Sequence, residues 1–299
     1  MRRALRAMVR RLDVWEWTKL QTIRARPYFG ERRQRRRYTS LTEEALRATR
    51  RSEAVFIFGS GYSINDITAS EWPAIAAHDT LSFNYFPHQR FVRADYHLVG
   101  ELVTGNDLRR REWEPPLREY AGLIASNPFY ERTVFLLQAG WSAYQSNRLV
   151  ALGLLPAASR IFRYRRTARG VYRPPSSSFA EGLVHGAATL VGCVNFAVLM
   201  GWRDIVLTGV DLFDSRYFWL PYDEARADMA GVVPHDQPYA MVQPLIAHLA
   251  SWVPLLAERG IRLSVYNPRS LLADVMPVFR RAAAPEAPMA PPQAQPSFG

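Results

Sequence analysis

The chain has 299 residues, 48% of them hydrophobic and 12% aromatic, which is enough to bury one large core or two small ones. No apolar run approaches the roughly 18 residues of a membrane-spanning helix, and five arginines within residues 1–11 leave no apolar stretch for a secretory signal. The single cysteine, Cys193, excludes an internal disulfide, so we expect a cytoplasmic protein.

The net charge of +11 is concentrated at the start of the chain. Residues 1–37 contain thirteen basic and three acidic side chains, which leaves a net charge of only +1 for all later residues. The chain also lacks a recognised nucleic-acid motif and an interleaved aromatic platform, so we do not expect it to bind nucleic acid.

We interpret residues 1–50 as a basic N-terminal arm. Apolar residues recur there at helical spacing, with the arginines largely off that stripe: Leu5, Met8, Val9, Leu12 and Trp15. A basic amphipathic helix suits the surface of an anionic inner membrane, where each nearby cation contributes about 1 kcal/mol. This interpretation predicts a peripheral protein of the inner membrane. A helix packed on the rest of the protein, followed by a charged linker, explains the pattern equally well.

Residues 51–281 alternate between short apolar strands and helices, which indicates an α/β domain with a mostly parallel sheet. The pattern predicts strands at residues 54–58, 80–83, 95–99, 133–137, 204–208 and 261–266. It predicts helices at residues 179–200, which are rich in small side chains, and at residues 243–259. We expect a lid or insertion at residues 140–178 and 214–242, and a disordered tail in the proline- and alanine-rich residues 282–299.

The first of these strands runs into the glycine loop Gly59-Ser60-Gly61-Tyr62-Ser63, where Ser63 or Asn65 is placed to cap a following helix. In such an arrangement, backbone amides and a helix N-terminus hold phosphate or sugar groups. The two glycines let the backbone approach a ligand, and Ser60 and Ser63 add hydroxyl donors. The dinucleotide fingerprint and the Walker lysine are incomplete here, so a tight turn without a ligand explains the loop equally well.

Three more polar residues follow predicted strands, at the sheet edge where open α/β sheets bind ligands. Asn84 follows the second strand, and its amide can donate and accept hydrogen bonds, although an isolated asparagine is more commonly a turn residue. Asp211 follows the strand at residues 204–208, and Asn267 follows the last strand.

Taken together and in this order, the segments resemble glycosyltransferase family 42, the bacterial lipooligosaccharide sialyltransferases. That family carries G-N-G-P-S-L, an asparagine after the second strand, S-G-I-D-F-Y and C-P-N-S-L-L-A. This chain carries Gly59-Ser60-Gly61-Tyr62-Ser63-Ile64, Asn84, Thr208-Gly209-Val210-Asp211-Leu212-Phe213 and Asn267-Pro268-Arg269-Ser270-Leu271-Leu272-Ala273. The resemblance spans most of residues 54–275. It implies a Rossmann-like nucleotide-sugar-binding domain with a small lid, a CMP-sialic acid donor, inversion at the anomeric carbon, and no metal or other cofactor.

The resemblance also implies roles for individual residues. Ser60 and Asn84 stand where the family has two asparagines that contact the nucleotide sugar, and Thr189 lies nearest a Ser or Thr that contacts the donor. Gly59, Gly61, Ser63, Asp211 and Asn267 complete the implied donor site. Of two tyrosines that steady the departing phosphate, the first is replaced by Phe213, and Tyr217 stands for the second. Arg216 is placed to compensate by pairing with the phosphate.

Catalysis in that family depends on a lid histidine, which acts as the general base. His235 follows the Asp211 segment and precedes a predicted helix, and an imidazole titrates in the pH range that this proton transfer needs. His248 is the competitor, but its setting among leucines favours packing. The histidines show no metal-ligand spacing, and Asp211 and Asp214 do not form an Asp-x-Asp pair, so we expect no metal site.

The implied partners are a glycan or glycolipid acceptor and, on the pattern of the family, further copies of the chain in a homo-oligomer. Two alternatives remain open. A diphosphokinase of the hydroxymethylpterin type also resembles the glycine loop and the Asp211 segment, but it requires Mg²⁺ and several carboxylates. A catalytically degenerate nucleotide-sugar-binding protein is the other, because Ser60 and Phe213 depart from the family pattern.

Overall fold

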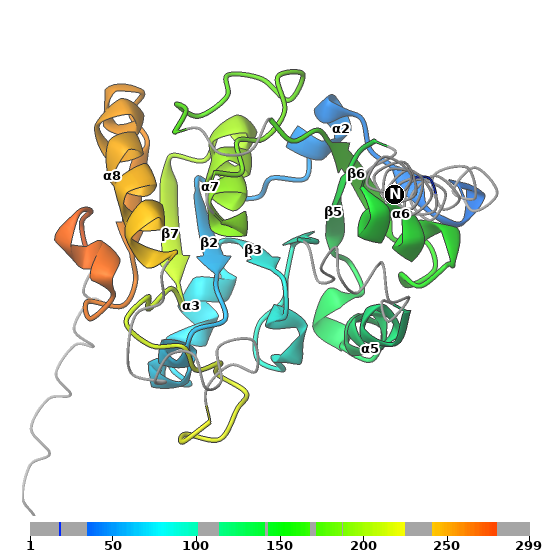
Figure 1. Ribbon diagram of the computed structural model, residues 1–299, viewed down its shortest axis with the longest axis horizontal. Helices are drawn as coiled ribbons and strands as arrows, with labels where there is room; N and C mark the ends of the chain where they lie inside the picture. The colour runs from blue at the N-terminus through cyan, green and yellow to red at the C-terminus, as the bar shows by residue number, and fades with distance from the viewer. Residues whose placement is uncertain are drawn as a thin grey trace, which may run out of the picture.

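The computed structural model describes residues 18, 35–100, 114–140, 143–167, 172–186, 188–224 and 241–279 (Figure 1). Most of the basic arm, His235 and residues 282–299 lie outside this described part, so it does not test the predictions made for them.

The described residues form one eight-stranded sheet with helices on both faces. The strands are β1 (Thr39–Ser40), β2 (Ala54–Phe58), β3 (Asp79–Phe83), β4 (Tyr96–Leu98), β5 (Val134–Gln138), β6 (Arg160–Tyr164), β7 (Asp204–Thr208) and β8 (Arg262–Val265). Their order across the sheet is β1-β6-β5-β4-β3-β2-β7-β8, and every pairing is parallel. The α/β fold class with a Rossmann-like sheet is therefore confirmed.

The strand order reverses between β2 and β7, and this reversal positions the site. From β2 the chain builds outward through β3, β4, β5 and β6, and it then returns to place β7 on the other side of β2. The loops that leave β2 and β7 lie side by side at the carboxyl ends of the strands, where the Gly59 and Gly61 amides bond to the end of β7 and the loop after it. Open α/β sheets bind their ligands at such a topological switch point.

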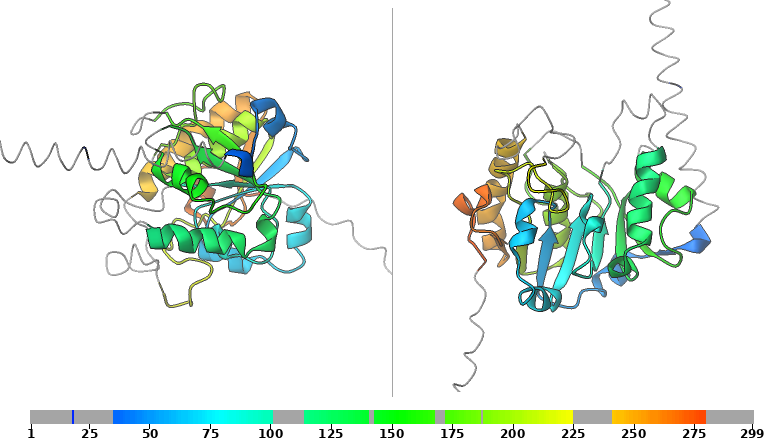
Figure 2. Two further views of the ribbon diagram at one scale, coloured as in Figure 1. Left: turned by 90° about the vertical axis from the view of Figure 1, so that its right-hand side faces the viewer. Right: turned by 90° about the horizontal axis from the view of Figure 1, so that it is seen from below.

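Helices cover the two faces because β2 is apolar at every position and β7 is apolar from Ile205 to Leu207. The α-helices are α2 (Glu43–Arg47), α3 (Trp72–Ala76), α5 (Glu114–Ala125), α6 (Tyr144–Ala151), α7 (Thr189–Met200) and α8 (Val242–Glu258). The short 3₁₀ helices are η1 (Arg35–Arg37), η2 (Tyr62–Asp66), η3 (Phe86–His88), η4 (Pro128–Tyr130) and η5 (Leu271–Asp274). Val55 and Ile57 pack in one cluster with residues of α7 and α8, whereas Phe56 and Phe58 pack in another with residues of α3 and η3. Figure 2 shows helices on both faces of the sheet. Alternation along the strand thus supplies both cores.

Two helix predictions are wrong at their start. The helix expected from residue 179 begins only at Thr189, because Gly182 and Gly186 have φ angles of 88° and 47° and form turns. The helix expected after the glycine loop is the 3₁₀ helix η2, whose N-cap residue Gly61 makes no side-chain cap. Ser63 and Asn65 therefore do not cap a helix.

The lid and the arm also need correction. Residues 140–178 contribute α6 and β6, and β6 pairs with both β5 and β1, so these residues build the sheet and do not form a lid. Residues 35–50 contribute β1 and α2, and Leu46 on α2 is fully buried. The end of the expected arm therefore belongs to the domain. Of the second expected lid, residues 214–224 pack on the glycine loop, and residues 225–240 lie outside the described residues.

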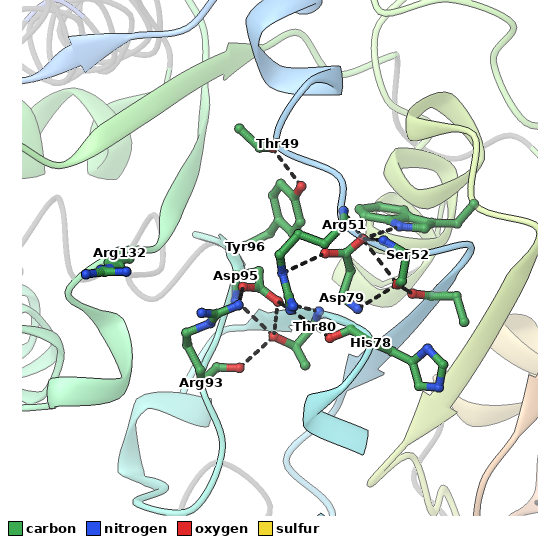
Figure 3. A network of polar contacts seen from close by, with 12 residues as sticks. Thr49, Arg51, Ser52, His78, Asp79, Thr80, Arg93, Asp95, Tyr96 and Arg132 are labelled. Atoms are coloured by element: carbon green, nitrogen blue, oxygen red, sulfur yellow. Dashed lines mark hydrogen bonds and ion pairs between the residues drawn. The ribbon is translucent and has the colours of Figure 1, made fainter. Parts of the chain in front are cut away.

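The opposite end of the sheet is fixed by a polar network around Asp79, the first residue of β3 (Figure 3). Its Oδ2 accepts hydrogen bonds from the backbone amides of Arg51 and Ser52 at 2.9 and 3.0 Å and from the indole of Trp202 at 2.9 Å. The Arg51 guanidinium bridges Asp79 and Asp95. These contacts tie the start of β2 to β3, far from the crevice.

Within the described part of the chain, every helix is too short or too polar to cross a membrane.

Candidate active site

A cavity of about 310 Å³ opens at the carboxyl ends of β2, β3 and β7, at the switch point of the sheet. Its walls come from the glycine loop, the end of β3, the start of α7, the loop after β7 and the first turn of α8. The sequence-predicted residues that line it are Gly59, Ser60, Gly61, Asn84, Thr189, Asp211, Arg216 and Tyr217. Five separate segments therefore meet around one space of the size that a small ligand needs.

The glycines of the loop are required by the chain itself. The Gly59 amide donates to the Thr208 carbonyl at 2.7 Å, and the Gly61 amide donates to the Gly209 carbonyl at 2.8 Å. A Cβ atom at Gly61 would lie 2.5 Å from Asp211 Oδ2, and one at Gly59 would collide with the Gly209 carbonyl. These two amides are thus bonded to the β7 loop and are not free to hold a phosphate, which corrects the role expected from the sequence.

Ser63 and Asn267 do not line the cavity; both bind Asp211. Asp211 Oδ2 accepts the Ser63 amide at 2.9 Å, and Oδ1 accepts the Ser63 hydroxyl and the Asn267 Nδ2 at 3.0 Å. Asp211 is only 3% exposed, so water does not solvate its carboxylate. These hydrogen-bond donors stabilise its negative charge instead. The three residues join the β2, β7 and β8 loops and position the cavity wall.

Asn84 offers a polar atom that has no protein partner within the described residues. It lies directly after β3 with a φ of 50°, and its Oδ1 is buried without a hydrogen bond. Gly100 packs against the Asn84 amide, and a Cβ atom there would also lie 3.1 Å from the Thr189 hydroxyl. Asn84 and Thr189 therefore meet at the same point of the cavity, across a position that only glycine fits.

Thr189 is the first residue of α7, whose first turn contains no acidic side chain and whose N-cap residue Ala188 provides no side-chain cap. The positive end of the helix dipole and its first amides are thus directed at the cavity wall formed by Ala188, Thr189 and Leu190. This end of α7 is the part of the described cavity best suited to an anionic group.

Tyr217 lies on the opposite wall, in a segment that packs along the glycine loop. Gly61 and Tyr217 form an antiparallel bridge, and the Phe218 amide donates to the Ser60 carbonyl at 3.2 Å. Ser60 and Tyr217 are therefore neighbours, as the resemblance implied for the residues around the donor phosphate.

Arg216 has a different role from the one expected. Its Nε donates to both oxygens of Asp214, at 3.0 and 2.8 Å, and its Nη1 donates to the Tyr222 carbonyl at 2.9 Å. The guanidinium carbon lies 4.3 Å from the Tyr62 ring centroid and 4.1 Å from that of Tyr222. The hydrogen bonds to Asp214 raise the pKa of Arg216. This cation is stacked and paired within the protein, and so it is not a free clamp for phosphate.

The predicted base, His235, lies outside the described residues. Its competitor His248 is 1% exposed, packs edge-on against Trp252 and lies 3.4 Å from the Arg173 carbonyl. Burial lowers the pKa of His248, which agrees with packing. Among the described residues, no three His, Cys, Asp or Glu side chains are grouped closely enough to bind a metal ion.

Sequence reasoning missed several residues of this region. Gly100 lies at the junction of Asn84 and Thr189, and Met241 and Leu245 of α8 close the cavity on one side. Trp219, Tyr85 and His88 form an aromatic group next to Tyr217. The run of aromatic residues Tyr217-Phe218-Trp219 was the available signal, and it forms a turn in which the Leu220 amide donates to the Tyr217 carbonyl at 3.2 Å.

The described residues form an α/β protein with a cavity at the switch point of a parallel sheet. No family model and no curated protein matches the sequence. Two solved structures are similar to this chain at low sequence identity. The Maf glycosyltransferase of Magnetospirillum magneticum is 18% identical with a TM-score of 0.46, and the match covers 83% of this chain and 36% of that one. The monofunctional alpha-2,3-sialyltransferase Cst-I of Campylobacter jejuni is 12% identical with a TM-score of 0.42, over 76% of this chain and 80% of that one. This chain thus spans about a third of the Maf protein.

Proposed function

We propose that the protein is a metal-independent glycosyltransferase that moves a nonulosonic acid from a CMP-sugar to a cell-surface glycan acceptor, with inversion at the anomeric carbon. The observation that carries the proposal is the meeting of Asn84 and Thr189 at the N-terminus of α7, inside the cavity at the switch point. The ordered sequence segments that resemble the family 42 sialyltransferases give the proposal its donor.

The donor would lie with its phosphate at the N-terminus of α7. The amides of the first helical turn and the Thr189 hydroxyl are suited to one phosphate group, and the helix dipole favours its negative charge. The Asn84 amide would read the sugar or the cytosine, since its unpartnered oxygen gains a hydrogen bond only when a donor group arrives. Gly59 and Gly61 shape the wall, and Asp211, Ser63 and Asn267 hold that wall in place.

In the proposed reaction, an acceptor hydroxyl oxygen forms the new bond to the anomeric carbon. The bond from that carbon to the phosphate oxygen breaks, and CMP leaves with the electron pair. His235 would take the acceptor proton, and the Tyr217 hydroxyl would donate a hydrogen bond to the departing phosphate. We also propose that residues 1–34 bring the protein to the cytoplasmic surface of the inner membrane, where lipid-linked glycan acceptors are accessible.

A thermal-shift panel tests the donor. The purified protein is heated with CMP, CDP, UDP, GDP or ATP, each with and without Mg²⁺, and CMP is expected to raise the melting temperature in the absence of metal. Stabilisation by ATP only in the presence of Mg²⁺ would instead identify a diphosphokinase. For the base, His235→Ala is expected to abolish release of CMP from CMP-N-acetylneuraminic acid while CMP binding is retained; unchanged turnover removes His235 from the mechanism.

A further inference from the structure

Four aromatic side chains stand together beside the cavity, two from the loop after β3 and two from the segment after β7. The rings of Tyr217 and Trp219 are stacked with centroids 4.1 Å apart, and those of Trp219 and His88 are stacked at 4.2 Å. Tyr85 packs at an angle against Tyr217 and Trp219. Tyr217, Trp219 and His88 therefore form three parallel rings, which we call the ring column.

The ring column is held rigidly from below. Phe218, between Tyr217 and Trp219 in the chain, is 8% exposed and packs against Phe86 at 5.5 Å. The bridge between Gly61 and Tyr217 fixes the same segment to the glycine loop. Because the rings are already in place, a ligand that stacks on them does not have to order them, which removes a common cost of binding.

The ring column differs from the core aromatics in its exposure. Tyr85, His88, Tyr217 and Trp219 are each partly exposed, whereas Phe58 and Phe86 beneath them are fully buried. Burial lowers the pKa of His88. A group of partly exposed aromatic rings, fixed in place beside a cavity, indicates a ligand surface.

The ring column is also continuous with the proposed donor site. Tyr217 belongs to both, since it lines the cavity while Trp219 covers one face of its ring. The column therefore continues from the cavity wall at Tyr217 to residues that do not line the cavity. In glycosyl transfer the acceptor hydroxyl must approach the reacting carbon to about 3–3.5 Å, so the acceptor has to lie directly beside the donor sugar.

We propose that the ring column is the acceptor subsite and that it binds a pyranose ring. One face of a pyranose presents C–H groups that pack on aromatic rings, while the hydroxyl groups around its edge stay available for transfer. This inference rests on the proposed glycosyl transfer, and it adds where the saccharide acceptor of that reaction binds.

Saccharide binding can be measured without any transfer reaction. Saturation-transfer NMR on the full chain, with and without CMP, would use methyl glucoside, methyl galactoside and methyl mannoside as probes, and a serine-containing peptide as the comparison. The wild-type protein is expected to bind at least one pyranoside. Trp219→Ala removes the middle ring, on which Tyr217 and His88 both stack, and is expected to weaken that binding at least tenfold. Trp219→Phe keeps a ring at this position and is expected to retain binding within threefold. Tyr172→Ala removes an aromatic ring that is 59% exposed and outside the cavity, and is expected to leave binding unchanged.

His88→Ala removes the outer ring of the column and is expected to weaken binding at least threefold, which keeps the test readable if Trp219→Ala does not fold. Equal pyranoside affinity in the wild type and in folded column variants would overturn the proposal. A saturation-transfer signal for the serine-containing peptide, with none for the pyranosides, would also overturn it. If the wild-type protein binds pyranosides but is not stabilised by CMP, the acceptor subsite is supported and the proposal of a CMP-sugar donor is contradicted.

Discussion

Ser63 binds Asp211 twice, through its backbone amide at 2.9 Å from Oδ2 and through its hydroxyl to Oδ1, although the residues lie 148 positions apart. Each residue follows a central strand, Ser63 after β2 and Asp211 after β7. The contact therefore closes the switch point of the sheet from outside the cavity, and Asn267 adds a third donor to the same carboxylate.

This contact predicts a large effect on stability. Asp211→Asn places an amide nitrogen against existing donors, so the free energy of unfolding is expected to fall by about 2–4 kcal/mol. Ser63→Ala removes one hydroxyl donor and is expected to cost about 1–3 kcal/mol. Urea denaturation followed by circular dichroism measures both. Ser60→Ala, in the same loop and without this contact, is the control and should change stability by less than about 0.5 kcal/mol. Equal stability of Asp211→Asn and the wild type would show that the carboxylate does not hold these loops.

Asn84 allows the recognition of the donor to be separated from the backbone. Its φ of 50° is readily adopted by glycine, so Asn84→Gly removes the amide without straining the turn. We expect this variant to keep its melting temperature within a few degrees and to lose about tenfold in CMP or CMP-sugar affinity, since one hydrogen bond to a ligand contributes about 1–1.5 kcal/mol. Isothermal titration calorimetry measures the affinity.

Thr80→Ser provides a control for Asn84→Gly, because it changes the same strand at the opposite end of the sheet. Ligand affinity that is the same in Asn84→Gly and in this control would remove Asn84 from the site.

His97 predicts how stability depends on pH. It is fully buried in β4. Its Nδ1 forms a hydrogen bond with the Ser82 hydroxyl at 2.7 Å, and its Nε2 forms one with the Tyr120 hydroxyl. Burial lowers the pKa of His97 to about 3, from 6.5 for an ordinary histidine. Between pH 6.5 and about 3, His97 is protonated in the unfolded chain but not in the folded protein. The free energy of unfolding therefore falls as the pH drops through this range. The expected slope from this residue is up to about 1.4 kcal/mol per pH unit.

Urea denaturation at pH values from 7 down to 4 measures that slope. His97→Gln is expected to flatten it, whatever its effect on stability at pH 7, whereas His78→Gln, at a partly exposed histidine, should leave it in place. An unchanged slope in His97→Gln would show that His97 titrates alike in both states.

How far the sequence leads is clear from particular elements. The apolar residues of 54–58 and 205–207 predicted β2 and β7, and the bounds 54–58 and 204–208 are those observed. A strand covered on both faces is apolar on both sides along its middle. In contrast, the sequence did not predict β6, because Arg160 and Arg163 interrupt its apolar residues and the resulting pattern is typical of a charged loop. The start of α7 was missed because glycines in a small-residue run fit both a helix and turns.

The site divides in the same way. Its cavity-lining residues follow strand ends, and that position can be read from the chain. The partners of Asp211 cannot, because hydrogen bonds between residues far apart leave no local pattern. Gly59 and Gly61 are an example. The glycines in the sequence indicate that other atoms approach the backbone closely, but only the fold shows that these atoms belong to the β7 loop.

The basic arm predicts electrostatic membrane binding. Deletion of residues 1–34 removes ten basic side chains, and the sequence predicts that it abolishes sedimentation with vesicles of mixed phosphatidylglycerol and phosphatidylethanolamine. Binding of the full chain should weaken as salt rises, because screening shortens the reach of each charge. Vesicles of phosphatidylcholine alone are the control. Equal binding to both kinds of vesicle, or equal binding without the arm, would favour the alternative in which this helix packs on the domain.

Asp214 and Arg216 predict strong coupling between two neighbouring charges. Their side chains are 2% and 10% exposed and share several hydrogen bonds, so removal of either one leaves the other charge poorly solvated. Asp214→Asn and Arg216→Gln are each expected to lower the free energy of unfolding by about 2–4 kcal/mol, with the double variant far less destabilised than the sum. Arg262 and Asp204 form an exposed pair whose coupling should stay below about 1 kcal/mol, and they serve as the control. If Arg216→Gln instead left stability intact and abolished CMP binding, the guanidinium would belong to the ligand, and Asp214 would only orient it.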